Sequence, residues 1–112
     1  MATPKLKTVV VKQPGQPAQA MQVAAIDMEF LQAQVGGNFD RVAVSGSALF
    51  MWFNEHIYDG QPERVGPTVV VGSTFIFGTI VVTGGDTPSG DTRGLTPLQA
   101  EQAMYFCGKS AV

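Results

Sequence analysis

The sequence predicts an α+β domain with a mostly antiparallel sheet of about five to six strands and two short helices packed on one face. β-Branched and aromatic runs lie close together and are separated by glycine- and proline-rich turns, which favours neighbouring antiparallel strands. Segments 27–37 and 96–108 instead carry helix-start and helix-stop residues around apolar residues at helical spacing. A chain of 112 residues suits one domain, which we place at 7–109 between a flexible N-terminal arm at 1–6 and a tail at 110–112.

The chain is expected to begin with a hairpin. Residues 8–11 are a threonine and three valines, a β-branched run typical of a strand. Proline and glycine within 13–17 end this strand, because proline fixes φ and glycine permits turns. Residues 20–24 form a second, weaker strand, which we expect to pair with the first.

The first helix is expected to start after Asp27, a residue that suits the N-cap position. Glu29 lies in the first turn, where the helix dipole favours a negative charge. The apolar residues within 30–35 fall on one helical face. Residues 36–37 are both glycine and end the helix, because glycine reaches the left-handed conformation without strain.

The middle of the chain has the pattern of further strands. Residues 39–44 are an expected strand and 45–47 a turn. The next run, 49–53, is apolar at every position, so neither face of that strand has the polar alternation of an exposed sheet face. Turn-forming residues on both sides of 56–58 predict another hairpin.

The strongest strand signals are residues 68–71 and 74–83. Gly72 or Gly78 is expected to mark a bulge or a close backbone approach. Residues 84–94 then form a loop without periodicity, of a length at which loops are often functional.

The last helix is predicted to start with a capping box, Thr96 to Gln99, with proline at its first position. An apolar stripe at helical spacing follows, made of Ala100, Ala103, Met104 and Cys107. Gly108 is expected to end the helix, and the thiol of Cys107 is expected to be buried and inert.

Charged residues make up only 14% of the chain, which excludes a charge-rich disordered protein, a polybasic nucleic-acid binder and a coiled coil. The four lysines lie near the termini, which leaves three arginines against nine acidic residues in the body of the domain. General nucleic-acid binding is therefore disfavoured.

We find no apolar run that would span a membrane and no secretory signal, and expect a cytoplasmic protein. The single cysteine excludes an internal disulfide.

Several landmarks resemble a small family found in phages and mobile elements, the domain of unknown function 3846. The residues that carry the resemblance are the strand at 9–11, Gly36 and Gly37, Asn54, and the segments 60–64, 77–82 and 94–99. The similarity spans about 6–106, with one departure at Glu63, where the family tends to have asparagine. It implies a phage-type accessory protein that acts in a bacterial host cytoplasm, and it implies no activity.

Six aromatic residues are concentrated in the predicted strands and hairpin: Phe50, Trp52, Phe53, Tyr58, Phe75 and Phe77. Because two short helices are expected to cover one face of the sheet, we expect the other face to stay uncovered, with Trp52 and Tyr58 on it or at an edge. Exposed apolar patches of this kind commonly mark a partner surface. We therefore predict a homo-oligomer, a dimer or higher, with Tyr58 and Arg64 at the rim of its interface.

We predict no catalytic residue. His56 lacks a nucleophile motif nearby and is interpreted as a hairpin-turn residue. Asp86 and Asp91 are weak candidates for a divalent metal, but calcium and magnesium sites usually gather more carboxylates. Arg93 is the residue of this loop that favours an anion.

We predict no cofactor, and three hypotheses for the function follow, of which only the third would need a metal ion. The first is a non-enzymatic, self-associating accessory protein whose loops around 56–64 and 86–93 bind or block a host factor. The second is a sponge that sequesters a small nucleotide signal between subunits, with Trp52 or Tyr58 stacking on the base and Arg64 or Arg93 binding phosphate. The third is a metal-dependent hydrolase that uses Asp86 and Asp91.

Overall fold

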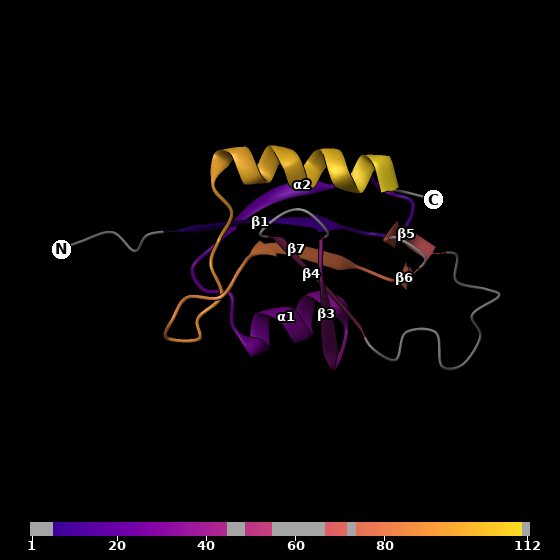
Figure 1. Cartoon of the computed structure of the whole chain (residues 1–112). Coiled ribbons are helices and arrows are strands. Elements are labelled where there is room, and N and C mark those ends of the chain that lie inside the picture. Colours follow the sequence, from indigo (N-terminus) through magenta and orange to yellow (C-terminus); the bar gives the residue numbers. More distant parts are fainter. Residues whose placement is uncertain (1–5, 45–48, 55–66, 72–73, 111–112) are drawn as a thin grey trace.

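The computed structural model describes residues 6–44, 49–54, 67–71 and 74–110. Its elements are, in chain order, β1 (Lys7–Lys12), β2 (Gln19–Val23), α1 (Met28–Val35), β3 (Phe39–Ala43), β4 (Leu49–Asn54), β5 (Pro67–Val71), β6 (Thr74–Phe77), β7 (Ile80–Gly84) and α2 (Pro97–Ser110). Five strands form one antiparallel sheet in the order β2-β1-β7-β4-β3, and β5 pairs with β6 in a separate two-stranded sheet (Figure 1). The predicted α+β class with a mostly antiparallel sheet is confirmed.

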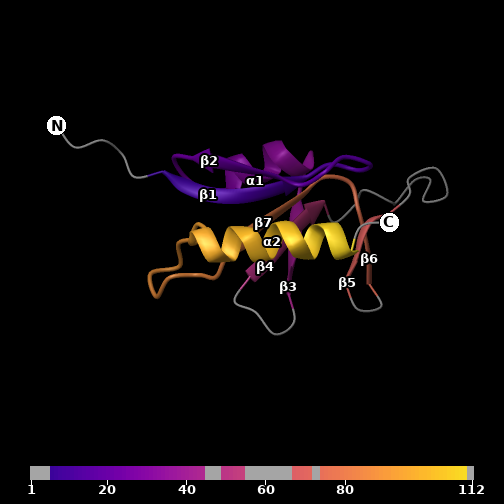
Figure 2. The same ribbon diagram turned by 90° about the horizontal axis from the view of Figure 1, so that it is seen from above.

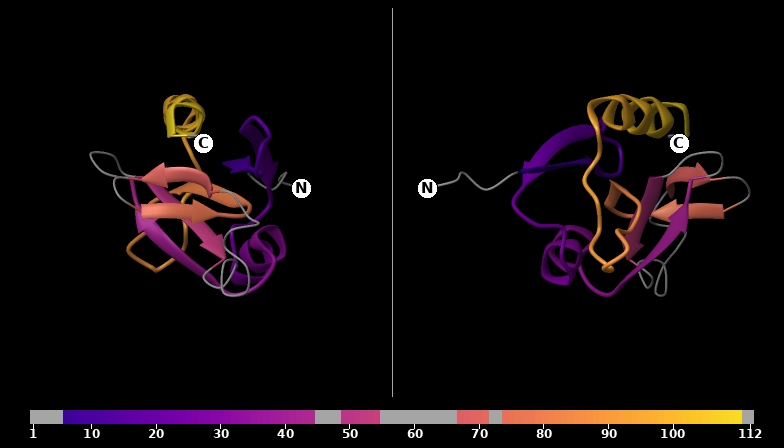
Figure 3. Two further views of the ribbon diagram at one scale, coloured as in Figure 1. Left: turned by 90° about the vertical axis from the view of Figure 1, so that its right-hand side faces the viewer. Right: turned by 60° about the vertical axis from the view of Figure 1, so that its left-hand side comes forward.

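The two helices lie on opposite faces of the five-stranded sheet, α2 above it and α1 below it in Figure 1, so the expectation of two helices on one face is wrong. The physical reason is the apolar character of the central strands. Consecutive residues of a strand point to opposite faces, and the pairs Val9–Val10 and Val81–Val82 are apolar at both positions. Each face therefore needs a helix to exclude water from it (Figure 3).

Each helix completes its own hydrophobic core. On the α1 side the buried residues are Val9, Ile26, Leu31, Val35, Trp52 and Val81. The core on the α2 side includes Val10, Met51, Val82, Ala103 and Cys107. α2 contacts β1, β2 and β5, and Figure 2 shows it running in roughly the direction of β1. The short sheet of β5 and β6 adds Val69 and Ile76 to the α2-side core.

The long strand expected at 74–83 is interrupted at Gly78. The φ of Gly78 is +77°, a value that favours glycine, so the chain changes direction there. β6 consequently pairs with β5, while β7 enters the large sheet between β1 and β4. All five residues of β7 are buried, which makes it the central strand of the protein.

Local signals define the start of both helices. The Asp27 carboxylate accepts a hydrogen bond from the backbone N–H of Phe30 at 2.9 Å, as expected for an N-cap. Before α2, the hydroxyl of Thr96 accepts from the N–H of Gln99 at 3.1 Å, and the side chain of Gln99 accepts from the N–H of Thr96 at 3.0 Å. The predicted N-cap and capping box are confirmed.

Of the two predicted C-terminal helix ends, one is confirmed and one is wrong. α1 ends at Gly36, whose φ is +85° and whose N–H donates to the carbonyl of Gln32, as predicted. The predicted stop at Gly108 is wrong, since α2 continues to Ser110. Gly108 does not adopt a positive φ and is an ordinary helical residue. The expected turn at 45–47 and the expected hairpin around 56–58 lie outside the described residues.

Candidate functional site

The structure places the predicted site residues in different parts of the molecule. Arg93, Asp86 and Asp91 all belong to the loop between β7 and α2. His56, Tyr58 and Arg64 lie outside the described residues. Trp52 lies on β4, in the core that α1 covers.

Trp52 is buried, with 7% of its surface exposed, so the expectation that it lies on an uncovered face is wrong. Its indole Nε1–H donates to the hydroxyl of Thr83 at 2.8 Å, and its ring meets Phe39 edge-on at a centroid distance of 5.3 Å. The Thr83 hydroxyl in turn donates to the carbonyl of Gly84 at 2.9 Å. Trp52 is therefore a satisfied core residue whose ring packs inside the protein.

The loop after β7 has a defined conformation rather than an irregular one. Asp86 and Thr92 form an isolated antiparallel bridge, and the N–H of Thr87 donates to the carbonyl of Asp91 at 2.7 Å. The N–H of Gly90 donates to the carbonyl of Thr87 at 2.9 Å and closes the turn at the tip of the loop. Gly90 has a φ of +93° there. The loop is thus a small hairpin that projects beyond the end of the sheet (Figure 1).

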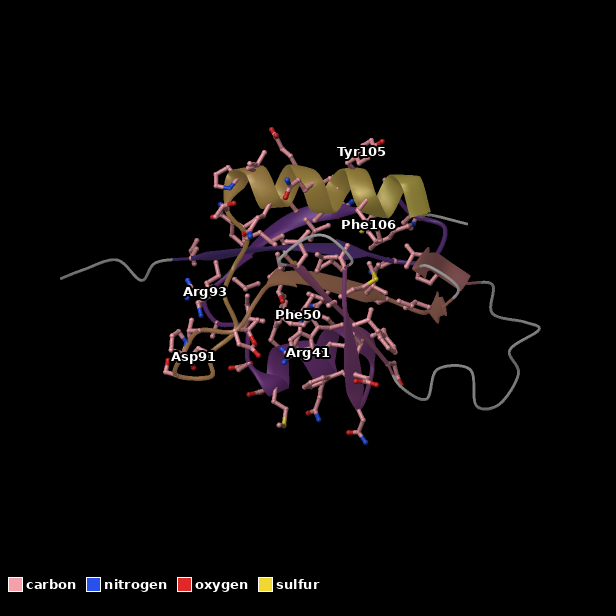
Figure 4. The ribbon with its side chains drawn as sticks, in the orientation of Figure 1. Arg41, Phe50, Asp91, Arg93, Tyr105 and Phe106 are labelled. Carbon is pink, nitrogen blue, oxygen red and sulfur yellow. The ribbon has the colours of Figure 1, made fainter. Side chains whose placement is uncertain are left out.

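Arg41 of β3 fastens this hairpin to the sheet. Its two terminal nitrogens donate to the two carboxylate oxygens of Asp86, at 2.9 and 2.8 Å. The guanidinium lies over the ring of Phe50, with its central carbon 4.2 Å from the ring centroid (Figure 4). The same carbon lies 5.1 Å from the ring centroid of Trp52. This geometry combines a two-point ion pair with cation–π contacts, for which arginine is better suited than lysine.

The ion pair shifts the pKa values of both Arg41 and Asp86. The hydrogen bond from Arg41, followed by burial in the opposite sense and by charge attraction, lowers the pKa of Asp86. The hydrogen bond to Asp86 likewise raises the pKa of Arg41. Since both carboxylate oxygens of Asp86 accept from Arg41, the pairing of Asp86 with Asp91 that the hydrolase hypothesis needs receives no support. Among the described residues no group of three or more His, Cys, Asp or Glu side chains is placed to hold a metal ion.

Arg93 lies beside the start of β1, next to a residue that we did not predict for this site. Lys7 and Arg93 both line a cavity of about 490 Å³ between the beginning of β1 and the segment that leads into α2. From the sequence we grouped Lys7 with the other lysines near the termini, because most of the chain separates it from Arg93. The sequence offered two separate signals. Lys7 is a basic residue at the start of a predicted strand, and Arg93 is an arginine shortly before the capping box.

Two close backbone contacts bring these segments together. The N–H of Leu95 donates to the carbonyl of Thr8 at 2.7 Å, and the N–H of Gly84 donates to the carbonyl of Arg93 at 3.0 Å. A Cβ on Gly94 would lie 2.9 Å from the Cβ of Lys7, so only glycine fits at this contact between the loop and β1 without a shift. The loop therefore holds Arg93 at a set position against β1.

Comparisons with known proteins identify a family but no characterised relative. In the described residues neither helix has both the length and the hydropathy of a membrane span. No curated protein and no solved structure was found to match the chain. A family model described as "Domain of unknown function (DUF3846)" matches residues 6–107, nearly the whole chain. The chain therefore belongs to this family, as the resemblance of its motifs implies.

Proposed function

We propose that this protein is a non-enzymatic, phage-type accessory protein that self-associates through β2 and binds or blocks a host factor. The phage-type role rests on the family resemblance, and the self-association rests on one structural observation. β2 is an edge strand of the five-stranded sheet, and within the part of the chain that the structure describes no further strand pairs with its outer side.

Several features make β2 suited to an interface. Its first four residues are exposed, and Met21 keeps 39% of its surface exposed. No charged residue occurs anywhere between Lys12 and Asp27. Proteins usually protect edge strands with charges, prolines or bulges, and depletion of charge is typical of interface cores. The opposite edge, β3, carries both Asp40 and Arg41, so the contrast lies within one sheet.

The backbone of β2 offers hydrogen-bonding groups in a defined pattern. The carbonyl of Thr8 accepts from Leu95 on the side of β1 that faces β7, away from β2. Backbone groups alternate in direction along a strand, so Val9 and its partner Met21 bond to each other. The N–H and C=O groups of Ala20 and Gln22 then point outward from the sheet edge.

A second copy of this chain fits that pattern. Antiparallel pairing of β2 with itself places Ala20 opposite Gln22 of the second copy, which joins the outward groups in hydrogen bonds. Met21 then faces Met21 of the second copy at a position without backbone hydrogen bonds, where side chains approach most closely. Such pairing is two-fold symmetric, the commonest arrangement of homo-oligomers, and extends one continuous sheet through both copies.

The oligomer is tested by measuring the mass of the protein in solution by light scattering and sedimentation over a concentration series. We expect a dimer at micromolar concentration. Met21→Lys places a charge at the centre of the interface, and Ala20→Pro removes an outward N–H without removing a bond to β1. Each change should raise the dimer dissociation constant by about tenfold or more.

Ala43→Lys is the matched control, because Ala43 is exposed on the opposite edge strand and the change adds the same charge. It should leave the dimer intact. A wild-type protein that stays monomeric at submillimolar concentration would refute self-association. Equal weakening by Ala43→Lys and Met21→Lys would refute the assignment to β2.

The outer face of α2 is the surface that we propose for the host factor. Leu98 and Tyr105 are 64% and 72% exposed and lie about two helical turns apart, roughly 10 Å. Tyr105 points away from the sheet, whereas Phe106 points toward it (Figure 4). Because opposed residues of an antiparallel pair share a face, a β2-paired dimer displays both α2 helices on the same side.

Affinity capture from a host lysate tests this surface when variants are compared. A partner bound by the wild type should be lost with Tyr105→Glu and retained with Ala43→Glu, which adds the same charge at an exposed position of β3, away from α2. Retention of the partner by Tyr105→Glu would contradict the assignment to α2, and a lysate that yields no partner would count against the proposed role.

A further inference from the structure

The cavity beside Lys7 has the size and the charge of a ligand site. Its volume of about 490 Å³ falls within the range of roughly 300–1,000 Å³ that is usual for small-molecule sites. Two cationic side chains line it, Lys7 from β1 and Arg93 from the loop before α2. Thr87 and Thr92 add hydroxyl groups, and no acidic residue of the described chain lines it.

Both cations are available to a ligand. The Nζ of Lys7 donates to the carbonyl of Thr92 at 3.2 Å, which leaves two of its three protons free. Arg93 is exposed, and the ion pair found among the described residues joins Arg41 and Asp86 instead. Two positive charges therefore share one cavity, and no acidic residue of the described chain forms an ion pair with either of them. The whole chain has more acidic than basic residues. An anion between them would relieve their mutual repulsion.

The remaining wall of the cavity is apolar. Leu6, Leu95 and Pro97 line it beside the two cations, and Leu6 keeps 53% of its surface exposed. A ligand that pairs its anionic group with Lys7 and Arg93 can thus place an apolar body against these residues. Trp52 does not line this cavity, so recognition of the body would not depend on that ring.

We propose that this cavity binds a small phosphate monoester with a compact apolar body, and that Lys7 and Arg93 hold its phosphate. A phosphate monoester carries nearly two negative charges at neutral pH, which match the two cations better than one carboxylate does. Its oxygens can also accept hydrogen bonds from the arginine fork and from the threonine hydroxyls. The cavity shares no lining residue with β2 and contains neither Leu98 nor Tyr105, so this inference goes beyond the proposed function.

Calorimetric titration with phenyl phosphate, inorganic phosphate, benzoate and phenol tests the ligand class. Phenyl phosphate should bind at least about tenfold more tightly than inorganic phosphate and benzoate, and phenol should give no binding. Absence of phenyl phosphate binding at millimolar concentration would overturn the proposal. Equal affinity for phenyl phosphate and inorganic phosphate would overturn the apolar part of it, and equal affinity for benzoate would overturn the preference for phosphate.

Variants locate the site. Arg93→Gln and Lys7→Met should each weaken phenyl phosphate binding by about tenfold or more, with the folded state checked by circular dichroism. Gln102→Glu changes the net charge by the same amount on an exposed position of α2 outside the cavity and should leave binding unchanged. Because Arg93 is exposed, its variant is expected to fold even if Lys7→Met does not. Unchanged affinity in Arg93→Gln would overturn the proposal, as would chemical-shift changes at residues remote from Thr92 and Leu95.

Discussion

Arg41 and Asp86 lie 45 positions apart in the sequence and form a two-point ion pair, with nitrogen–oxygen distances of 2.9 and 2.8 Å. The pair joins the edge strand β3 to the hairpin that follows the central strand β7. The aromatic rings beneath the guanidinium restrict its orientation, so the carboxylate meets a prepositioned partner. The pair is partly exposed, with 34% and 38% of the two side chains accessible, and its main effect should be local.

Asp86→Asn removes the charge from this pair and should loosen the hairpin without unfolding the domain. We expect the amide protons of Thr87 and Gly90 to exchange with solvent several-fold faster than in the wild type, as measured by NMR. Asp91→Asn is the control, since Asp91 lies in the same hairpin and its carboxylate accepts from Ser89. Equal effects of the two changes would contradict the specific role of Arg41.

The pair also predicts how the hairpin responds to acid. The pKa of Asp86 is lowered in the folded protein, so the pair is fully formed above the ordinary aspartate pKa of about 3.9 and is lost as the pH falls through the lowered value. NMR shifts of the hairpin amides should change at a midpoint below about pH 3.9. A midpoint at or above that value would show that the pair does not form in solution.

Thr83→Val should destabilise the protein through the unpaired indole of Trp52. The Thr83 hydroxyl is the acceptor for Nε1–H at 2.8 Å, and both residues are buried. An unsatisfied buried donor costs about 1–3 kcal/mol, which urea unfolding followed by tryptophan fluorescence can measure. Thr83→Ser keeps the hydroxyl and should cost less. If the valine variant is as stable as the wild type, the hydrogen bond contributes nothing.

Two glycine-to-alanine changes should have opposite effects on thermal stability. A Cβ on Gly94 would lie 2.9 Å from the Cβ of Lys7 and 3.0 Å from the N of Thr8, so Gly94→Ala should destabilise the protein by roughly 1–3 kcal/mol. Gly108 is helical and has open space around its Cβ direction, so Gly108→Ala should stabilise by about 0.5–1 kcal/mol. Thermal unfolding of both variants checks the prediction, and a destabilised Gly108→Ala would contradict the extension of α2 to Ser110.

Cys107 should resist alkylation in the folded protein. Burial raises the pKa of its thiol to about 11, and the charge of Lys12 acts in the opposite sense. The thiol is therefore protonated and inaccessible at pH 8, and iodoacetamide should label it only in denaturant. Since the folded pKa is raised, the stabilising effect of the neutral thiol is present below the unfolded pKa and is lost as the pH rises through about 11. Rapid labelling of the native protein would refute its burial.

The sequence by itself determined the local structure of this protein. Asp27 and Gly36 delimit α1, and the capping box at Thr96 starts α2, because these residues act through hydrogen bonds and φ preferences within a few positions. The apolar run 49–53 likewise indicated a strand with two apolar faces. Met51 and Trp52 belong to cores on opposite sides of the sheet, whereas we expected the face of Trp52 to stay uncovered. Local patterns were sufficient for both helix starts and for the end of α1, where the interacting groups are neighbours in the chain.

Only the tertiary structure decided how these elements combine into surfaces. Helix propensity does not indicate which face of the sheet a helix will cover. The residues around Gly108 likewise do not indicate whether the helix ends there or continues. The cavity lined by Lys7 and Arg93 brings together residues that are distant in sequence, and so does the ion pair between Arg41 and Asp86. Neither feature therefore has a local sequence pattern. The outer edge of β2 emerged in the same way, because a strand becomes an edge only when every other strand has found its neighbours.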